Sequence, residues 1–160
     1  MNSFNTHPFH RARGFTLVEA LVALVVLSIG MLGIAALYVE SLRAGRTALI
    51  RTEAVNLAAS MADRIRANRL GAATYAKAVD DTGAFDGNCE EGGDSASCTP
   101  DVMANHDKAV WNAEIVQALP GGTAQIDYDG TTTPDSYVIT VSWVEAGQDG
   151  MVSYVMRVQI

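Results

Sequence analysis

The sequence predicts an α+β protein in which a long N-terminal α-helix packs on a small C-terminal antiparallel sheet. Three features predict this fold: an apolar run of roughly 25 residues near the N-terminus, a helical apolar stripe directly after it, and three alternating segments at the C-terminal end. With 160 residues, the chain is long enough for a membrane-spanning helix and one small domain.

The first element is the apolar run that follows Arg11 and Arg13 and ends near Val39. About 20 apolar residues cross a bilayer, and flanking arginines keep the adjoining terminus in the cytoplasm. The run is too long for the apolar core of a secretory signal peptide. An ordinary anchor fits its length, with Glu19 either protonated or at the membrane interface. Such an anchor gives no reason for Glu19, because an ionised carboxylate inside a membrane helix is unfavourable.

The segment "RGFTLVEALVALVV" resembles the prepilin signal of type IV pilins and pseudopilins. A basic leader ends at Gly14, and it is followed by Phe15 and a hydrophobic run whose fifth residue is Glu19. The resemblance implies a leader peptide of residues 1–14, cut by prepilin peptidase between Gly14 and Phe15, and N-methylation of Phe15. It also implies that Glu19 pairs with the N-terminal amine of a neighbouring subunit during assembly. A carboxylate and an ammonium attract each other far more strongly in a low-dielectric layer than in water.

The helix is predicted to continue beyond the apolar run, to about residue 69. This part contains no proline, and its apolar residues recur every three or four positions, at Ile50, Ala54, Leu57, Met61 and Ile65. Its arginines fall mostly on the other faces, where they form a solvated surface or dock acidic heads of neighbouring subunits. We therefore expect residues 15–39 to be a transmembrane or filament-core helix and residues 40–69 to be its amphipathic half. Residues 70–160 would form a periplasmic or extracellular head.

Within the head, residues 107–119 predict a short helix that ends at Pro120. Trp111 in this helix is interpreted as a partly buried packing residue rather than a ligand platform. Alternating apolar residues predict strands over residues 123–129, 137–145 and 151–160, and the last two are joined by a hairpin turn with the sequence "AGQDG". Their apolar face is expected to cover the helical stripe.

Charge is distributed unevenly along the chain. Residues 1–14 carry +2, residues 15–69 carry +2, and residues 70–160 carry −11. The acidic head argues against nucleic acid or anionic lipid as its partner, because phosphates repel such a surface.

Cys89 and Cys98 predict one disulfide in a loop-like segment of an exported domain. A zinc site would need two further ligands, and His106 is the only histidine beyond the leader. We expect His106 to be exposed near a helix start, and a Cys98–His106 catalytic pair would require a free thiol. Calcium is a further alternative at the loop, because acidic and amide residues alternate there at Asp86, Asn88 and Glu90; the closing glutamate of a calcium loop is missing.

These patterns predict no enzyme, no catalytic residue, no metal and no cofactor. The segments "MADRIRANR" and "DKAVWNAEIVQALPGG" resemble the PilV type of minor pilin, the type IV pilus modification protein. The resemblance implies a structural subunit that helps to initiate pilus assembly, with a place in a tip complex and links to cell adhesion and twitching motility. Its implied partners are other minor pilins, the major pilin, prepilin peptidase, the inner-membrane assembly machinery and a tip adhesin. Its implied location is the bacterial inner membrane, with a cytoplasmic N-terminus and a periplasmic head, and then the pilus.

Two other functions remain open from the sequence. A pseudopilin of a type II secretion pseudopilus would have the same N-terminal features. A membrane-anchored periplasmic binding module would predict no processing at Gly14 and no dependence on Glu19.

Overall fold

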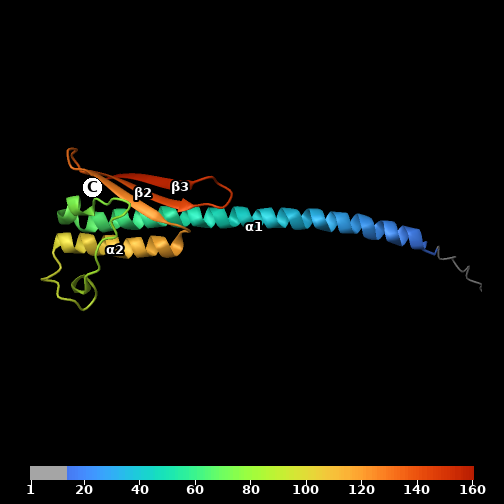
Figure 1. Ribbon diagram of the computed structural model, residues 1–160, viewed down its shortest axis with the longest axis horizontal. Helices are drawn as coiled ribbons and strands as arrows, with labels where there is room; N and C mark the ends of the chain where they lie inside the picture. The colour runs from blue at the N-terminus through green and yellow to red at the C-terminus, as the bar shows by residue number, and fades with distance from the viewer. Residues whose placement is uncertain (1–13) are drawn as a thin grey trace, which may run out of the picture. The chain divides into compact units, whose positions relative to one another are not determined.

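The computed structural model describes residues 14–160, so nearly all of the predicted leader lies outside the described residues. The chain divides into two compact units, Met1–Ala44 and Gly45–Ile160, which are described separately below. The elements, in chain order, are α1 (Leu17–Ala67), the 3-10 helices η1 (Arg69–Tyr75) and η2 (Gly87–Cys89), α2 (Pro100–Ala118), and strands β1 (Thr123–Asp129), β2 (Ser136–Val144) and β3 (Met151–Gln159). The predicted α+β class is confirmed (Figure 1).

Helix α1 has no proline, and it spans 51 residues without interruption, close to the predicted range of 15–69. In the first unit, its apolar side chains are all exposed, from Leu17 to Leu42. The helix is long and apolar enough to cross a membrane. A helix that is apolar on every side and exposed in the single chain requires either lipid or neighbouring subunits around it.

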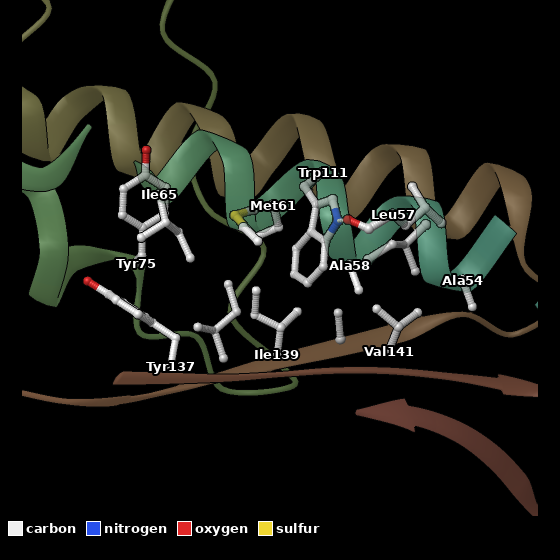
Figure 2. Close-up of a cluster of buried hydrophobic side chains, with 14 of the residues drawn as sticks. Ala54, Leu57, Ala58, Met61, Ile65, Tyr75, Trp111, Tyr137, Ile139 and Val141 are labelled. Carbon is white, nitrogen blue, oxygen red and sulfur yellow. Dashed lines mark hydrogen bonds between the residues drawn. The ribbon is translucent and has the colours of Figure 1, made fainter. Parts of the chain in front are cut away.

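In the second unit, the sheet covers one face of α1 and α2 lies along another (Figure 1). Ala54, Leu57, Met61 and Ile65 of α1 are all in the core between α1, α2 and the sheet (Figure 2), as their three-four-four spacing along one helix face predicts. Ala58 and Ala62 are buried beside them. Together with side chains of β1, β2 and α2, these residues form a single hydrophobic core.

The sheet is antiparallel, with strand order β1-β2-β3. On β2, alternate residues are buried against α1: Tyr137, Ile139, Val141 and Trp143. All three strands lie within one residue of their predicted bounds, because a half-buried strand alternates apolar and polar residues with a period of two. Glycines with positive φ stand in the β2–β3 turn, at Gly147 and Gly150.

Helix α2 is longer than predicted. It starts at Pro100, not at residue 107, because the Thr99 side chain caps it by accepting a hydrogen bond from the Val102 N–H, with proline in its first turn. Its end at Ala118 agrees with the stop expected at Pro120. Trp111 is fully buried rather than partly so, and its indole N–H donates a 2.8 Å hydrogen bond to the Leu57 carbonyl (Figure 2).

Candidate functional site

The N-terminal end of α1 holds the residues predicted to direct processing and assembly. Gly14, Phe15 and Thr16 precede the helix, and Phe15 is exposed. The Thr16 hydroxyl accepts a 3.2 Å hydrogen bond from the Glu19 N–H. A Thr followed three residues later by a Glu is the pattern of a capping box, in which the hydroxyl satisfies one of the free N–H groups of the first turn. The scissile bond predicted between Gly14 and Phe15 therefore lies just outside a well-started helix.

Glu19 is exposed in the first turn of α1. A carboxylate there interacts favourably with the positive end of the helix dipole. Within residues 14–160, its side-chain oxygens have no hydrogen-bond or ion-pair partner, and the side chains around it are the apolar residues of the same helix. The part of the chain that the structure describes thus leaves this carboxylate available for a cation supplied from elsewhere.

Arg64 of α1 is at the centre of an ionic network that joins this helix to α2. Its guanidinium donates to Asp107 and to Glu114 of α2, each at 3.1 Å. Asp107 also accepts a hydrogen bond from the Tyr75 hydroxyl. Burial raises the pKa of Tyr75, and the hydrogen bond to Asp107 raises it further. The expectation that the arginines near the helix end are a solvated face is therefore wrong for Arg64, whose guanidinium joins the two helices.

A second ion pair ties α1 to the sheet. Arg51 donates to Glu145, just after β2, through two hydrogen bonds of 3.2 and 3.0 Å. A two-pronged arrangement of this kind fixes orientation as well as adding attraction. Glu145 is buried although it stands next to a surface turn, so the pair holds the end of β2 against the helix.

Two lysines that the sequence gave no reason to single out are buried. Lys77, with only 2% of its surface exposed, donates to the Ala78 and Ala124 carbonyls. Burial lowers its pKa. Lys108 pairs with Asp81 at 2.9 Å. Burial by itself would raise the pKa of the Asp81 carboxyl, but the Gly83 N–H and the Lys108 ammonium outweigh it and hold the pKa below its ordinary value.

The loop between η1 and α2 is closed by a disulfide between Cys89 and Cys98, as predicted. The loop is also pinned to α2, because the Asp86 N–H donates a 3.0 Å hydrogen bond to Nδ1 of His106. His106 is only 7% exposed and lies in the middle of α2. The expectation of an exposed histidine near a helix start is wrong, because α2 begins a full turn and more before the predicted start.

Two regions of the chain match known family models. Residues 9–35 match the prokaryotic N-terminal methylation motif, and residues 36–109 match the type IV pilin model named Tt1218-like. The chain carries a type IV pilin domain. Neither the comparison with curated proteins nor the comparison with solved structures gives a match.

The first match contains Gly14, Phe15 and Glu19, and the second covers the amphipathic half of α1, the disulfide loop and the first half of α2. The sheet lies beyond both matched ranges. The structure alone therefore shows that this chain has the α+β architecture of a pilin. The methylation motif and the exposed apolar helix indicate membrane anchoring. They also imply contact with other pilins and with an assembly machinery.

The loop residues weighed for calcium and for catalysis have other roles in this pilin. The Asp86 carboxylate accepts a hydrogen bond from the Asn88 N–H and caps η2. Both cysteine sulfurs are in the disulfide, so Cys98 has no thiol to act with His106. Among residues 14–160, no three histidine, cysteine or acidic side chains gather in a metal-binding arrangement. The family is structural, and the charged groups described above stabilise the head.

Proposed function

We propose that this chain is a minor pilin of the PilV type that helps to initiate or modify a type IV pilus. A role of this pilin in the assembly of a pilus or pseudopilus follows from its two family matches. The finer assignment is supported by the resemblance of residues 61–69 and 107–122 to that type. The observation that carries the assembly role is an exposed apolar helix with one carboxylate, Glu19, in its first turn, which has no partner among residues 14–160.

The proposed sequence of events begins with hydrolysis of the Gly14–Phe15 bond at the cytoplasmic face. Removal of 14 of 160 residues leaves a mature chain of 146 residues, and a methyl group is then added to the Phe15 amine. Residues 15–39 hold this chain in the inner membrane, residues 40–69 continue the helix, and residues 70–160 form the periplasmic head. When the subunit enters the filament, apolar helices of its neighbours replace the surrounding lipid.

Pairing between Glu19 and the N-terminal ammonium of a neighbour would set the axial position of each subunit. Each of these charges is unfavourable alone in an apolar layer, and together they form a close ion pair. A subunit displaced along its neighbour leaves both charges unpaired. The pairing therefore acts on register, while the surrounding apolar contacts supply most of the attraction.

The processing step is tested by the N-terminal sequence and intact mass of the protein from membranes and from sheared filaments, without reduction. We expect a chain that starts at methylated Phe15 and whose two cysteines are oxidised. A chain that retains the leader, or one cut beyond the apolar run, contradicts the proposal. Recovery with sheared pili favours a pilus subunit, whereas loss of type II secretion with normal pili would favour a pseudopilin.

The pairing role of Glu19 is separable from a capping role by matched substitutions. Glu19→Gln removes the charge but retains an N3 residue that suits a capping box, and Thr16→Val removes the capping hydroxyl but leaves the carboxylate. We expect Glu19→Gln to reach the membrane at a normal level and to be depleted from sheared pili at least tenfold, and Thr16→Val to be incorporated nearly normally. Glu19→Asp is a control that preserves the charge. The reverse pattern, with Thr16→Val depleted and Glu19→Gln incorporated, would show that capping is what matters.

A further inference from the structure

Strand β3 leaves one edge of the head's sheet open. The strand pairs residue by residue with β2, from Met151 opposite Val144 to Gln159 opposite Ser136. Within residues 14–160, β3 has no second partner strand, and its only neighbour in the sheet is β2. The opposite edge differs, because Lys77 forms an isolated antiparallel bridge to Ile126 of β1 through two backbone hydrogen bonds of 2.9 Å.

The residues of β3 that face the core are covered only in part. On β2, the inward side chains are at most 2% exposed, whereas every inward apolar side chain along β3 and just after it is half-buried: Val152, Tyr154, Met156, Val158 and Ile160. Helix α1 and β2 cover one side of this row, and its other side has no neighbouring strand among the described residues. A further strand with apolar inward residues would complete the burial.

Apart from the outward charge of Arg157, the strand lacks the features by which natural edge strands usually avoid pairing. Over nine residues, it has no proline, no lysine, and no inward-pointing charge, and its register with β2 is free of bulges. Natural sheets use such devices against unwanted pairing, and an edge without them is suited to adding a strand.

Charge indicates which strand would fit. Strands β2 and β3 contain one charged residue, Arg157, in a head that otherwise carries many acids. Arg157 faces away from the core beside Val138, and it has no ion-pair partner in the part of the chain that the structure describes. Because β3 contains no acid, a second copy of this strand would not supply a carboxylate opposite Arg157.

We propose that the open edge of β3 accepts a β-strand of a different polypeptide, with apolar residues facing the core and a carboxylate opposite Arg157. The row of free N–H and C=O groups supplies main-chain hydrogen bonds to the added strand, and the half-buried row supplies the apolar contact. Opposite charges across a strand pair add to this stability, and like charges oppose it. This inference does not depend on the assignment to a pilus, because it rests on the sheet alone.

The test uses the full chain in detergent micelles and a fluorescent nine-residue peptide. The peptide has the sequence of Ser136–Val144 with glutamate at the position of Val138, which lies opposite Arg157 in the native register. We expect saturable binding by fluorescence anisotropy, above that of empty micelles, and at least threefold weaker binding by Arg157→Glu. A peptide with lysine at the same position should bind the Arg157→Glu chain more tightly than the unaltered chain.

Two controls keep the result specific. A peptide with prolines at the positions of Ile139 and Val141 cannot form a ladder and should not bind. The emission of Trp111 and Trp143 verifies that Arg157→Glu retains the core. Absence of saturable binding, equal binding of the proline peptide, or an affinity unaffected by Arg157→Glu overturns the proposal. Efficient disulfide dimerisation of a Val155→Cys chain through this exposed position would also overturn it, by showing that a second copy occupies the edge.

Discussion

Replacing Arg64 with methionine removes the cation that joins α1 and α2 but retains most of the volume of the side chain. The Asp107 side chain is 12% exposed and that of Arg64 is 25% exposed, so the loss leaves a mostly buried carboxylate without its cation. Breaking a fully buried pair costs about 3–5 kcal/mol, and an exposed pair is worth at most about 1 kcal/mol. Because water reaches Arg64 and Glu114, we expect Arg64→Met to lower the free energy of unfolding by about 2–3 kcal/mol.

The measurement is urea unfolding of the full chain in micelles, followed by the fluorescence of Trp111 and Trp143, both of which are buried in the head. Arg66→Met is the matched control, because Arg66 pairs with Asp63 at an exposed site, and we expect a change of about 0.5 kcal/mol or less.

A second substitution tests the cause of the loss. If the cause is the Asp107 carboxylate left without a cation, Asp107→Asn in the Arg64→Met background should restore part of the stability, because a neutral amide costs less to bury. An Arg64→Met loss equal to that of Arg66→Met, or a further loss on adding Asp107→Asn, would refute the reasoning.

Three other perturbations test the packing of Trp111 in the core, the titration of Tyr137 and the disulfide of the loop. Trp111→Phe removes the indole hydrogen bond and leaves a small void, so we expect a loss of about 2 kcal/mol by the same urea assay; no loss would mean that the indole is not packed as described. Burial raises the pKa of Tyr137 to about 12 from 10.0, so the unfolded chain loses this proton first and stability should fall between those pH values; in Tyr137→Phe that fall should be smaller. Reduction of the Cys89–Cys98 bond should lower the unfolding free energy by about 2.5 kcal/mol on the chain-entropy account, whereas a Cys89→Ser, Cys98→Ser double variant should be insensitive to reductant.

The elements with a clear period were predictable from the sequence. The strands alternate with a period of two, and the helical stripe from Ile50 to Ile65 follows the spacing of one helix face, so both faces and bounds were predicted to within one or two residues. The start of α2 differs from the prediction although its signal is present in the sequence: Thr99 followed by Pro100 is a typical helix start, and it lies directly after the disulfide loop.

The buried charges could not be predicted in the same way. Arg64 and Asp107 are 43 residues apart in sequence, and Arg51 and Glu145 are 94 apart, so no local spacing indicates that they meet. Lys77 is buried because its ammonium finds two carbonyl oxygens, and these are positioned by the tertiary fold. Composition could show only that such residues are usually exposed.

The residues predicted to direct processing and assembly are a third case. Glu19 is conspicuous in the sequence because a carboxylate is unfavourable in an apolar helix, but the roles predicted for Gly14, Phe15 and Glu19 come from their resemblance to a known signal. The structure adds the Thr16 cap, which accepts from the Glu19 backbone N–H and so does not require the Glu19 carboxylate.

The disulfide has a practical consequence for anyone following this protein on a gel. No lysine or arginine lies between Lys77 and Lys108, so trypsin has no site in the loop, whereas Glu90 and Glu91 lie between the two cysteines. A protease that cuts after glutamate there would open the backbone, yet the two fragments would stay covalently joined. The cut chain would migrate as one band until thiol is added and then separate into two, so intactness has to be judged on reduced samples.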